Sequence, residues 1–185
     1  WRQFLYDKCA SNVPYNQLAS EILAADGVEG EKRPAVKFYL DRGSELHGIT
    51  RDVGRVFFGM DIECAQRHDH PNITGYKQAD YYGIHAFLVR SFQFAAKDKK
   101  PVFAEKAEGE ATFKSVFEKT GEPTTALPEL PSGAALQEPT FEKGKEYEVA
   151  PAKNVRPVPK FSRRSELVRL ATSGNKQFDR NVANR

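Results

Sequence analysis

Hydrophobic residues recur at helical spacing at the start of the chain. One helix face is formed by Trp1, Phe4, Leu5 and Cys9. Asn12 and Pro14 are expected to end that helix, and Pro14 suits the first turn of the next one. The second face is formed by Tyr15, Leu18, Ala19, Ile22 and Leu23, with Gly27 expected just past its end. Together these stretches predict a helical hairpin.

Two more helices are predicted before residue 95, after a short apolar segment, Ala35–Leu40, that fits either a strand or a helical turn. The third helix is expected to begin at Thr50 as its N-cap. Its apolar face is formed by Ile49, Val53, Val56, Phe57 and Met60. The fourth is predicted from about Lys77 to Phe94, with Tyr81, Ile84, Leu88 and Phe92 on one face. If the two helices pack together, the connection between them has a rigid frame on both sides.

The hydrophobic pattern changes after residue 96. Residues 111–117 alternate between apolar and polar positions, which predicts a half-buried strand. Residues 122–160 contain seven of the 11 prolines and predict extended crossings with edge strands. Tyr147 and Val149 are predicted to pair with the earlier strand. Ser162 is predicted to cap a helix that Gly174 ends, and Asn175 to begin another.

These elements predict an α+β fold that is mainly α. Residues 1–160 are expected to form one domain, with a helical core at 1–96 and a β-rich extension at 97–160. Residues 161–185 are expected to begin a following helical domain that is truncated. Because the chain opens on Trp1 inside one predicted helix and closes on Arg185 inside another, we expect it to be a fragment of a longer protein.

Composition narrows the classes of partner. The chain has 28 basic and 25 acidic residues, a net charge of +3, and no concentrated basic face. Nucleic-acid binding is therefore not expected. No apolar run approaches the roughly 20 residues of a membrane-spanning helix, so membrane insertion is not expected in these residues either.

One stretch concentrates the reactive side chains. Residues 57–71 read FFGMDIECAQRHDHP. In c-type haem attachment, the motif C-x-x-C-H supplies two thiols that form thioethers and a histidine that ligates the iron. Here Cys64 and His68 keep the first thiol and the ligand, whereas Arg67 replaces the second cysteine. At most one thioether is therefore possible.

Two other interpretations of the same stretch remain open. Cys64, His68, Asp69 and His70 are side-chain types that bind zinc or another transition metal. If residues 64–68 are helical, the spacing of four places Cys64 and His68 on one face. Alternatively the segment is structural, with Asp69 capping a turn, the two histidines bonded to backbone and Cys64 buried.

Catalytic motifs are absent from the sequence, which leaves enzymatic activity undecided. It contains no nucleophile elbow, phosphate-binding loop or dinucleotide-binding motif. Asp61, Glu63 and Asp69 are close in sequence but are expected to be solvated. His47 is expected to lie in a loop, and His85 to be a partly exposed helical residue.

The flanks of the motif add a family resemblance. ITRDVGRVFFGMDIECAQRHDHP, followed by QADYYGIHAF, resembles the planctomycete-type domain of unknown function 1549, which carries CAQCHDHP at this point. The opening residues 1–27 are similar to the helical hairpin of that family and ATFKSVF to its later strand. SELVRLATSGNKQFDRNVANR resembles the start of domain of unknown function 1553.

The resemblance implies a function and a setting. It implies a c-type-cytochrome-like module of a multidomain exported bacterial protein, with haem c at Cys64 and His68, for electron transfer or redox sensing. Arg67 departs from the pattern and is expected to face a haem propionate, Asp69 or water. Other domains of the chain and redox proteins are the expected partners, in an extracytoplasmic compartment. The alternative is a non-redox structural or interaction module.

Overall fold

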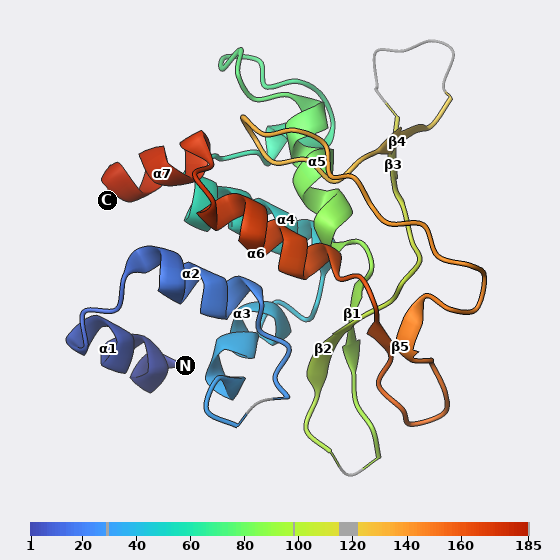
Figure 1. The fold of residues 1–185 in the computed structure, drawn as a ribbon. Coiled ribbons are helices and arrows are strands. Elements are labelled where there is room, and N and C mark those ends of the chain that lie inside the picture. The colour runs from blue at the N-terminus through green and yellow to red at the C-terminus, as the bar shows by residue number, and fades with distance from the viewer. Residues whose placement is uncertain (29, 98, 115–121, 185) are drawn as a thin grey trace.

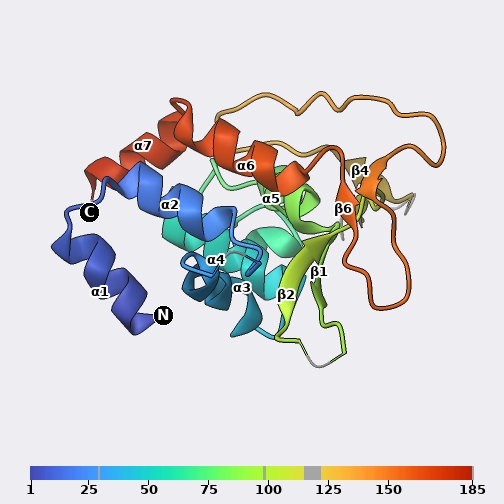
Figure 2. The same ribbon diagram turned by 60° about the horizontal axis from the view of Figure 1, so that its bottom comes forward.

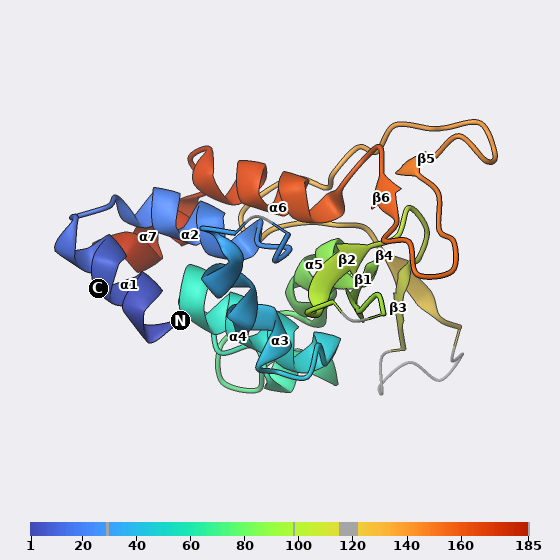
Figure 3. The same ribbon diagram turned by 90° about the horizontal axis from the view of Figure 1, so that it is seen from below.

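The computed structural model describes residues 1–28, 30–97, 99–114 and 122–184 (Figure 1). Within these ranges the chain forms helices at one end and short strands at the other, as Figure 3 shows from below. The predicted α+β class with mainly helical content is confirmed. The α-helices are α1 (Arg2–Ala10), α2 (Tyr15–Leu23), α3 (Lys37–Leu40), α4 (Leu46–Phe58), α5 (Gln78–Leu88), α6 (Arg163–Thr172) and α7 (Lys176–Ala183), with 3-10 turns η1 (Arg33–Val36) and η2 (Cys64–Gln66).

The predicted hairpin is formed by α1 and α2. Asn12 takes a left-handed conformation between them, with φ of 50°, and Pro14 is the N-cap of α2. Gly27 does not end α2, because the helix closes at Ala24 and Gly27 lies in the loop beyond it. The segment Ala35–Leu40 is helical, since η1 and α3 cover it.

Helix α4 begins earlier than predicted. Glu45 is its N-cap, and the Glu45 carboxylate accepts hydrogen bonds from the backbone N–H groups of His47 and Gly48. The prediction that Thr50 caps this helix is wrong, because Thr50 lies buried inside it. Gly59 ends the helix with φ of 63°, a left-handed conformation that glycine adopts without strain.

Helix α5 is shorter than the predicted span to Phe94. It ends at Leu88, and the chain turns into strand β1 (Ser91–Phe94), which pairs antiparallel with β2 (Val102–Glu105). Phe92 therefore lies in a strand and not on the helix face. Tyr81, Ile84 and Leu88 are fully buried, as the helical spacing predicted.

Two further strand pairs form the rest of the extension. Strand β3 (Ala111–Phe113) pairs with β4 (Thr124–Ala126), while β5 (Tyr147–Val149) pairs with β6 (Val158–Pro159). The predicted pairing of Tyr147 and Val149 with the strand at residue 111 is therefore wrong. The beginning of that predicted strand is confirmed by β3, and its end at 115–117 lies outside the described residues.

The hydrophobic core draws on all parts of the chain. Helices α2, α4 and α5 each contribute several of its buried residues, and α6 lies across α2 and α5 (Figures 1 and 2). The extension adds Phe103 and Leu130, and the last helices add Leu167, Ala171 and Phe178. Both predicted C-terminal helices are found, with side-chain caps at Ser162 and Asn175. The division of the chain at residues 96 and 160 stays a prediction.

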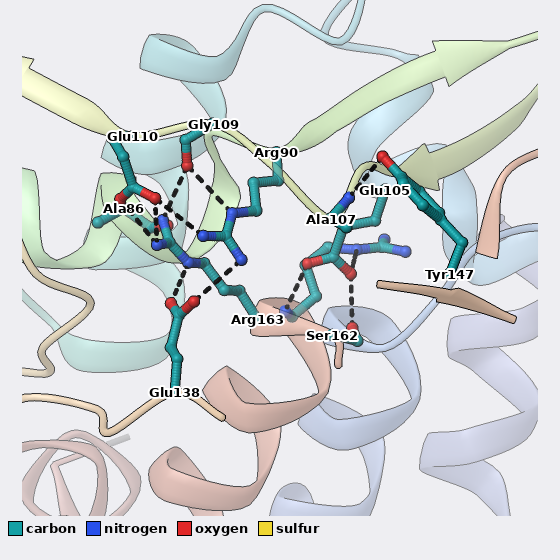
Figure 4. Close-up of polar contacts among 11 residues, drawn as sticks. Ala86, Arg90, Glu105, Ala107, Gly109, Glu110, Glu138, Tyr147, Ser162 and Arg163 are labelled. Atoms are coloured by element: carbon teal, nitrogen blue, oxygen red, sulfur yellow. Dashed lines mark hydrogen bonds and ion pairs between the residues drawn. The ribbon is translucent and has the colours of Figure 1, made fainter. Parts of the chain in front are cut away.

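Two consecutive buried arginines join α6 to the other layers. Arg163 donates to the carbonyls of Ala86 (2.9 Å) and Gly109 (3.2 Å) and to the carboxylates of Glu110 and Glu138 (Figure 4). Arg164 donates to the carbonyls of Ala25 and Phe103. Arg90 shares the carboxylates of Glu110 and Glu138 with Arg163. These hydrogen bonds and ion pairs attach α6 to α5 and to the β-rich extension.

Candidate functional site

The CAQRHDHP stretch lies in the connection between α4 and α5, as predicted from the sequence (Figure 1). Three buried apolar residues of this connection, Met60, Ile62 and Ala65, contribute to the core. Ile62 packs against Gly54 of α4, where a Cβ atom would lie 2.7 Å from Ile62 Cδ1. The small residue at position 54 therefore allows the connection to lie directly on α4.

Cys64 and His68 are one turn apart. Cys64 begins the 3-10 turn η2 and is an exposed free thiol, like Cys9. The backbone N–H of His68 donates to the carbonyl of Cys64 at 3.3 Å. The His68 side chain is half-buried, so both residues remain accessible from the surface.

The ring of His68 has a defined tautomer. Its Nδ1 lies 2.7 Å from the carbonyl oxygen of Asp69. Because a carbonyl only accepts, Nδ1 carries the hydrogen, and the neutral ring has its lone pair on Nε2. Histidines that ligate metals are commonly oriented in this way, by a hydrogen bond from the other ring nitrogen to backbone.

Asp69 and His70 hold the local structure. Asp69 Oδ1 accepts from the backbone N–H of Gln78, in the first turn of α5, at 2.8 Å. His70 Nδ1 accepts from the N–H groups of Asn72 and Ile73 at 3.2 and 3.1 Å. These contacts are those expected of a helix cap and a tight turn.

A tyrosine of α5 orients the motif backbone. The hydroxyl of Tyr82 donates to the carbonyl of Gln66 at 3.2 Å, and the Gln78 side chain donates to the same oxygen at 3.4 Å. The Tyr82 ring is stacked on Phe113 of β3, with 4.5 Å between centroids. Sequence reasoning missed Tyr82, since helical spacing placed its neighbour Tyr81 on the core face; the only signal was its position in the DYYG motif.

The charged side chains of the connection do not form one cluster with each other. Arg67 is exposed, and Asp69 pairs with Lys77 at 3.9 Å and not with Arg67. Glu63 pairs with Arg51 of α4 at 3.2 Å, and Asp61 accepts from the backbone of Glu63. The carboxylates at 61, 63 and 69 are all exposed, as expected, and none is paired with another for acid–base chemistry.

The donor set fits one side of a c-type haem attachment better than a zinc site. Cys64 offers an accessible thiol and His68 a nitrogen lone pair, whereas Arg67 offers no second thioether. Within the described ranges, no three His, Cys, Asp or Glu side chains are grouped to hold a metal ion.

No helix of the same ranges is long and apolar enough to cross a membrane.

Comparison with known proteins bears on the first half of the chain. No curated protein and no solved structure matches it. Residues 1–92, which include α1 to α5 and the whole CAQRHDHP stretch, match the family model PSCyt2, described as protein of unknown function (DUF1549). The predicted continuation into domain of unknown function 1553 stays a prediction. The match identifies residues 1–92 of this chain as a DUF1549 domain.

Proposed function

We propose that this chain is a c-type-cytochrome-like module that binds haem through a single thioether at Cys64, with His68 as an axial ligand. The observation that carries the proposal is the exposed Cys64 thiol one turn before a histidine whose Nε2 holds the lone pair. Bound haem would supply a one-electron iron couple, suited to electron transfer or redox sensing. From the family resemblance we infer that the module belongs to a multidomain exported protein, works in an extracytoplasmic compartment and meets other domains and redox proteins there.

The protein residues have distinct parts in this proposal. Cys64 would hold the haem covalently, and the Asp69 carbonyl keeps the His68 ring oriented through Nδ1. Tyr82 and Gln78 hold the intervening backbone through the Gln66 carbonyl. Arg67 is exposed and carries a positive charge, which suits a propionate.

Haem attachment is tested by expressing the chain with an export signal in a host that contains a c-type haem-attachment system. We expect a Soret band, a mass increase of one haem and retention of the haem after acidic organic extraction. Cys64→Ser should lose the covalent haem. Cys9→Ser is the matched control, because Cys9 is the other exposed thiol, and it should retain the haem.

Arg67→Cys tests whether the missing second anchor is the only defect of the motif. We expect this variant to attach haem in higher yield and through two thioethers. If neither the native chain nor Arg67→Cys retains haem, the haem proposal is rejected.

A second candidate function is a non-redox structural or interaction module. It is favoured by the contacts of Asp69 and His70, which complete the fold of the connection without a ligand. Native-like folding of the haem-free chain, together with failure of both attachment experiments, would support it. Among the residues that the structure describes, the grouping of side chains gives no support for zinc binding; stoichiometric zinc in the purified protein would support it.

A further inference from the structure

Two of the four histidines lie against each other between α4 and α5. The rings of His47 and His85 are nearly parallel, with an interplanar angle of 7° and 4.6 Å between their centroids. His85 is only 7% exposed, and His47, in the first turn of α4, is half-buried. The proposed haem site uses neither residue, so the inference below does not depend on it.

Hydrogen bonds define which nitrogen of His85 can take a proton. Thr50 Oγ1 donates its hydrogen to the carbonyl of Leu46 at 2.7 Å, and it also lies 2.9 Å from His85 Nδ1. The hydroxyl has one hydrogen, so it must accept from Nδ1–H. A second proton on the ring would therefore go to Nε2 and make it an imidazolium.

The surroundings of His85 disfavour that charge. The nearby carboxylate is Glu45; burial acts to raise its pKa, but the N–H groups of Gly48 and His47 outweigh this and hold it below the ordinary value. Glu45 is therefore ionised in the acidic range, but it makes no ion pair with His85. Strand β4 and the turn η2 also contact α5. Strand β4 contains no charged residue, and the one titratable residue of η2 is the exposed Cys64. The other neighbours are neutral rings or cations: Tyr81 and Tyr82 of α5, Phe113 of β3, Arg51 of α4 and Arg163 of α6.

Burial is the main reason why the pKa of His85 is lowered to about 4, and His47 acts in the same direction. Glu45 acts in the opposite direction, with a smaller effect. In an open form the solvated ring regains its ordinary pKa of 6.5. The open form therefore takes up a proton between pH 6.5 and 4, whereas the closed form does not. Acidification across this window favours opening, and the effect stops growing below about pH 4.

We propose that the stacked pair of His47 and His85 is an acid-sensitive latch between α4 and α5. At neutral pH the His85 ring is uncharged and packs against His47. In acid, the open form is favoured because His85 can take up a proton there, whereas in the closed form the positive charge would be buried, and the two helices separate. Because these helices frame the Cys64–His70 connection, acid also loosens that connection.

The size of the effect follows from the two pKa values. The opening equilibrium is expected to rise about twentyfold from pH 7 to pH 5, and about 240-fold from pH 7 to the acid limit. Hydrogen exchange measured on the full chain at both pH values, after correction for intrinsic exchange rates, reports this opening by segment. Protection in α4 and α5 should fall at pH 5, whereas the peripheral helix α1 should not respond.

Variants assign the response to one ring. His85→Asn keeps an N–H donor near the position of Nδ1 but cannot gain a proton, so the ratio of protection between the two pH values should approach one. His47→Asn removes the ring stacked on His85 and should reduce the response. His70→Asn is the matched control: its side-chain oxygen can still accept from the turn amides, and the acid response should remain.

Three results would overturn the latch. They are equal protection at both pH values in the native chain, a persistent response in His85→Asn, and a response lost in His70→Asn. If His85→Asn does not fold, nuclear magnetic resonance titration of the native His85 ring decides. Titration near pH 6.5 without changes in the α5 amides would reject the proposal, and titration near pH 4 accompanied by such changes would support it.

Discussion

At the scale of single residues, close approaches by other parts of the chain explain two glycines of the DUF1549 domain. Gly83 of α5 lies under the extension, where the N–H of Glu129 donates to the Gly83 carbonyl at 3.3 Å. A Cβ atom at position 83 would lie 2.6 Å from the Glu129 carbonyl oxygen. Gly54 has the corresponding role beneath Ile62. The glycine of DYYG thus allows the backbone at Glu129 to lie directly on α5, a contact that the residues next to Gly83 in the sequence do not predict.

Gly83→Ala is expected to destabilise the protein by about 1–3 kcal/mol, because the added methyl group forces the Glu129 backbone away from α5. Chemical denaturation monitored by circular dichroism measures the loss. Gly75→Ala is the matched control, since nothing lies within 4 Å of a Cβ there. Equal stability of the two variants would contradict the close approach.

The cap of α5 gives a second prediction at this scale. Asp69→Ala removes the carboxylate that accepts from the Gln78 N–H, and should lower the free energy of unfolding by about 1 kcal/mol. Asp69→Asn keeps an acceptor oxygen and should lose less. Denaturation at neutral pH distinguishes the two, and an equal loss would show that charge and not the hydrogen bond stabilises the helix start.

At the scale of elements, α6 is attached by polar side chains as well as by its apolar face. Arg163 is 2% exposed and bonds to groups from α5, from the chain beyond β2 and from the chain beyond β4 (Figure 4). Arg164 reaches the opposite side, where its guanidinium packs over the Phe103 ring at 4.9 Å. The two consecutive arginines therefore connect one helix to several layers.

Arg163→Met is expected to cost about 1–3 kcal/mol, because it leaves the buried Ala86 carbonyl without its donor and leaves Arg90 as the one buried guanidinium beside Glu110 and Glu138. Thermal and urea denaturation measure this loss. Arg169→Ala on the same helix is the control, since its pair with Glu166 lies at the surface and should contribute little to stability. A small effect of Arg163→Met would mean that packing alone retains α6.

At the scale of the whole molecule, the matched family region does not contain its own complete core. Phe103, Leu130, Leu167, Ala171 and Phe178 belong to the same hydrophobic cluster as α2, α4 and α5, but they lie beyond residue 92. Helix α6 covers both α2 and α5. Removing residues 93–185 would expose these apolar faces to water.

Residues 1–92 expressed alone are therefore expected not to fold cooperatively. We expect poor dispersion of amide resonances and a broad thermal transition, whereas residues 1–185 should show a single sharp transition. Nuclear magnetic resonance and calorimetry on the two chains test this. A well-dispersed spectrum of the short chain would show that the helical region is self-sufficient.

Local patterns in the sequence determined much of this protein. Helical periodicity predicted the core faces of α2, α4 and α5, the caps Ser162 and Asn175 were readable from their residue types, and Cys64 and His68 were evident as the reactive pair. Such features depend on neighbours within a turn or two, which the sequence contains directly. Asp69 was predicted to cap a turn, whereas its carboxylate accepts from the Gln78 N–H at the start of α5, nine residues further along the chain.

Only the tertiary structure decided which distant groups meet. It ended α5 at Leu88 because the next residues pair with β2, and it joined Tyr147 to Pro159 instead of to the strand at residue 111. It also buried His85 against His47, although helical position alone suggested an exposed ring and a loop. Strand partners and buried polar pairs depend on contacts between segments that are remote in the sequence. A local pattern cannot predict the free energy of those contacts.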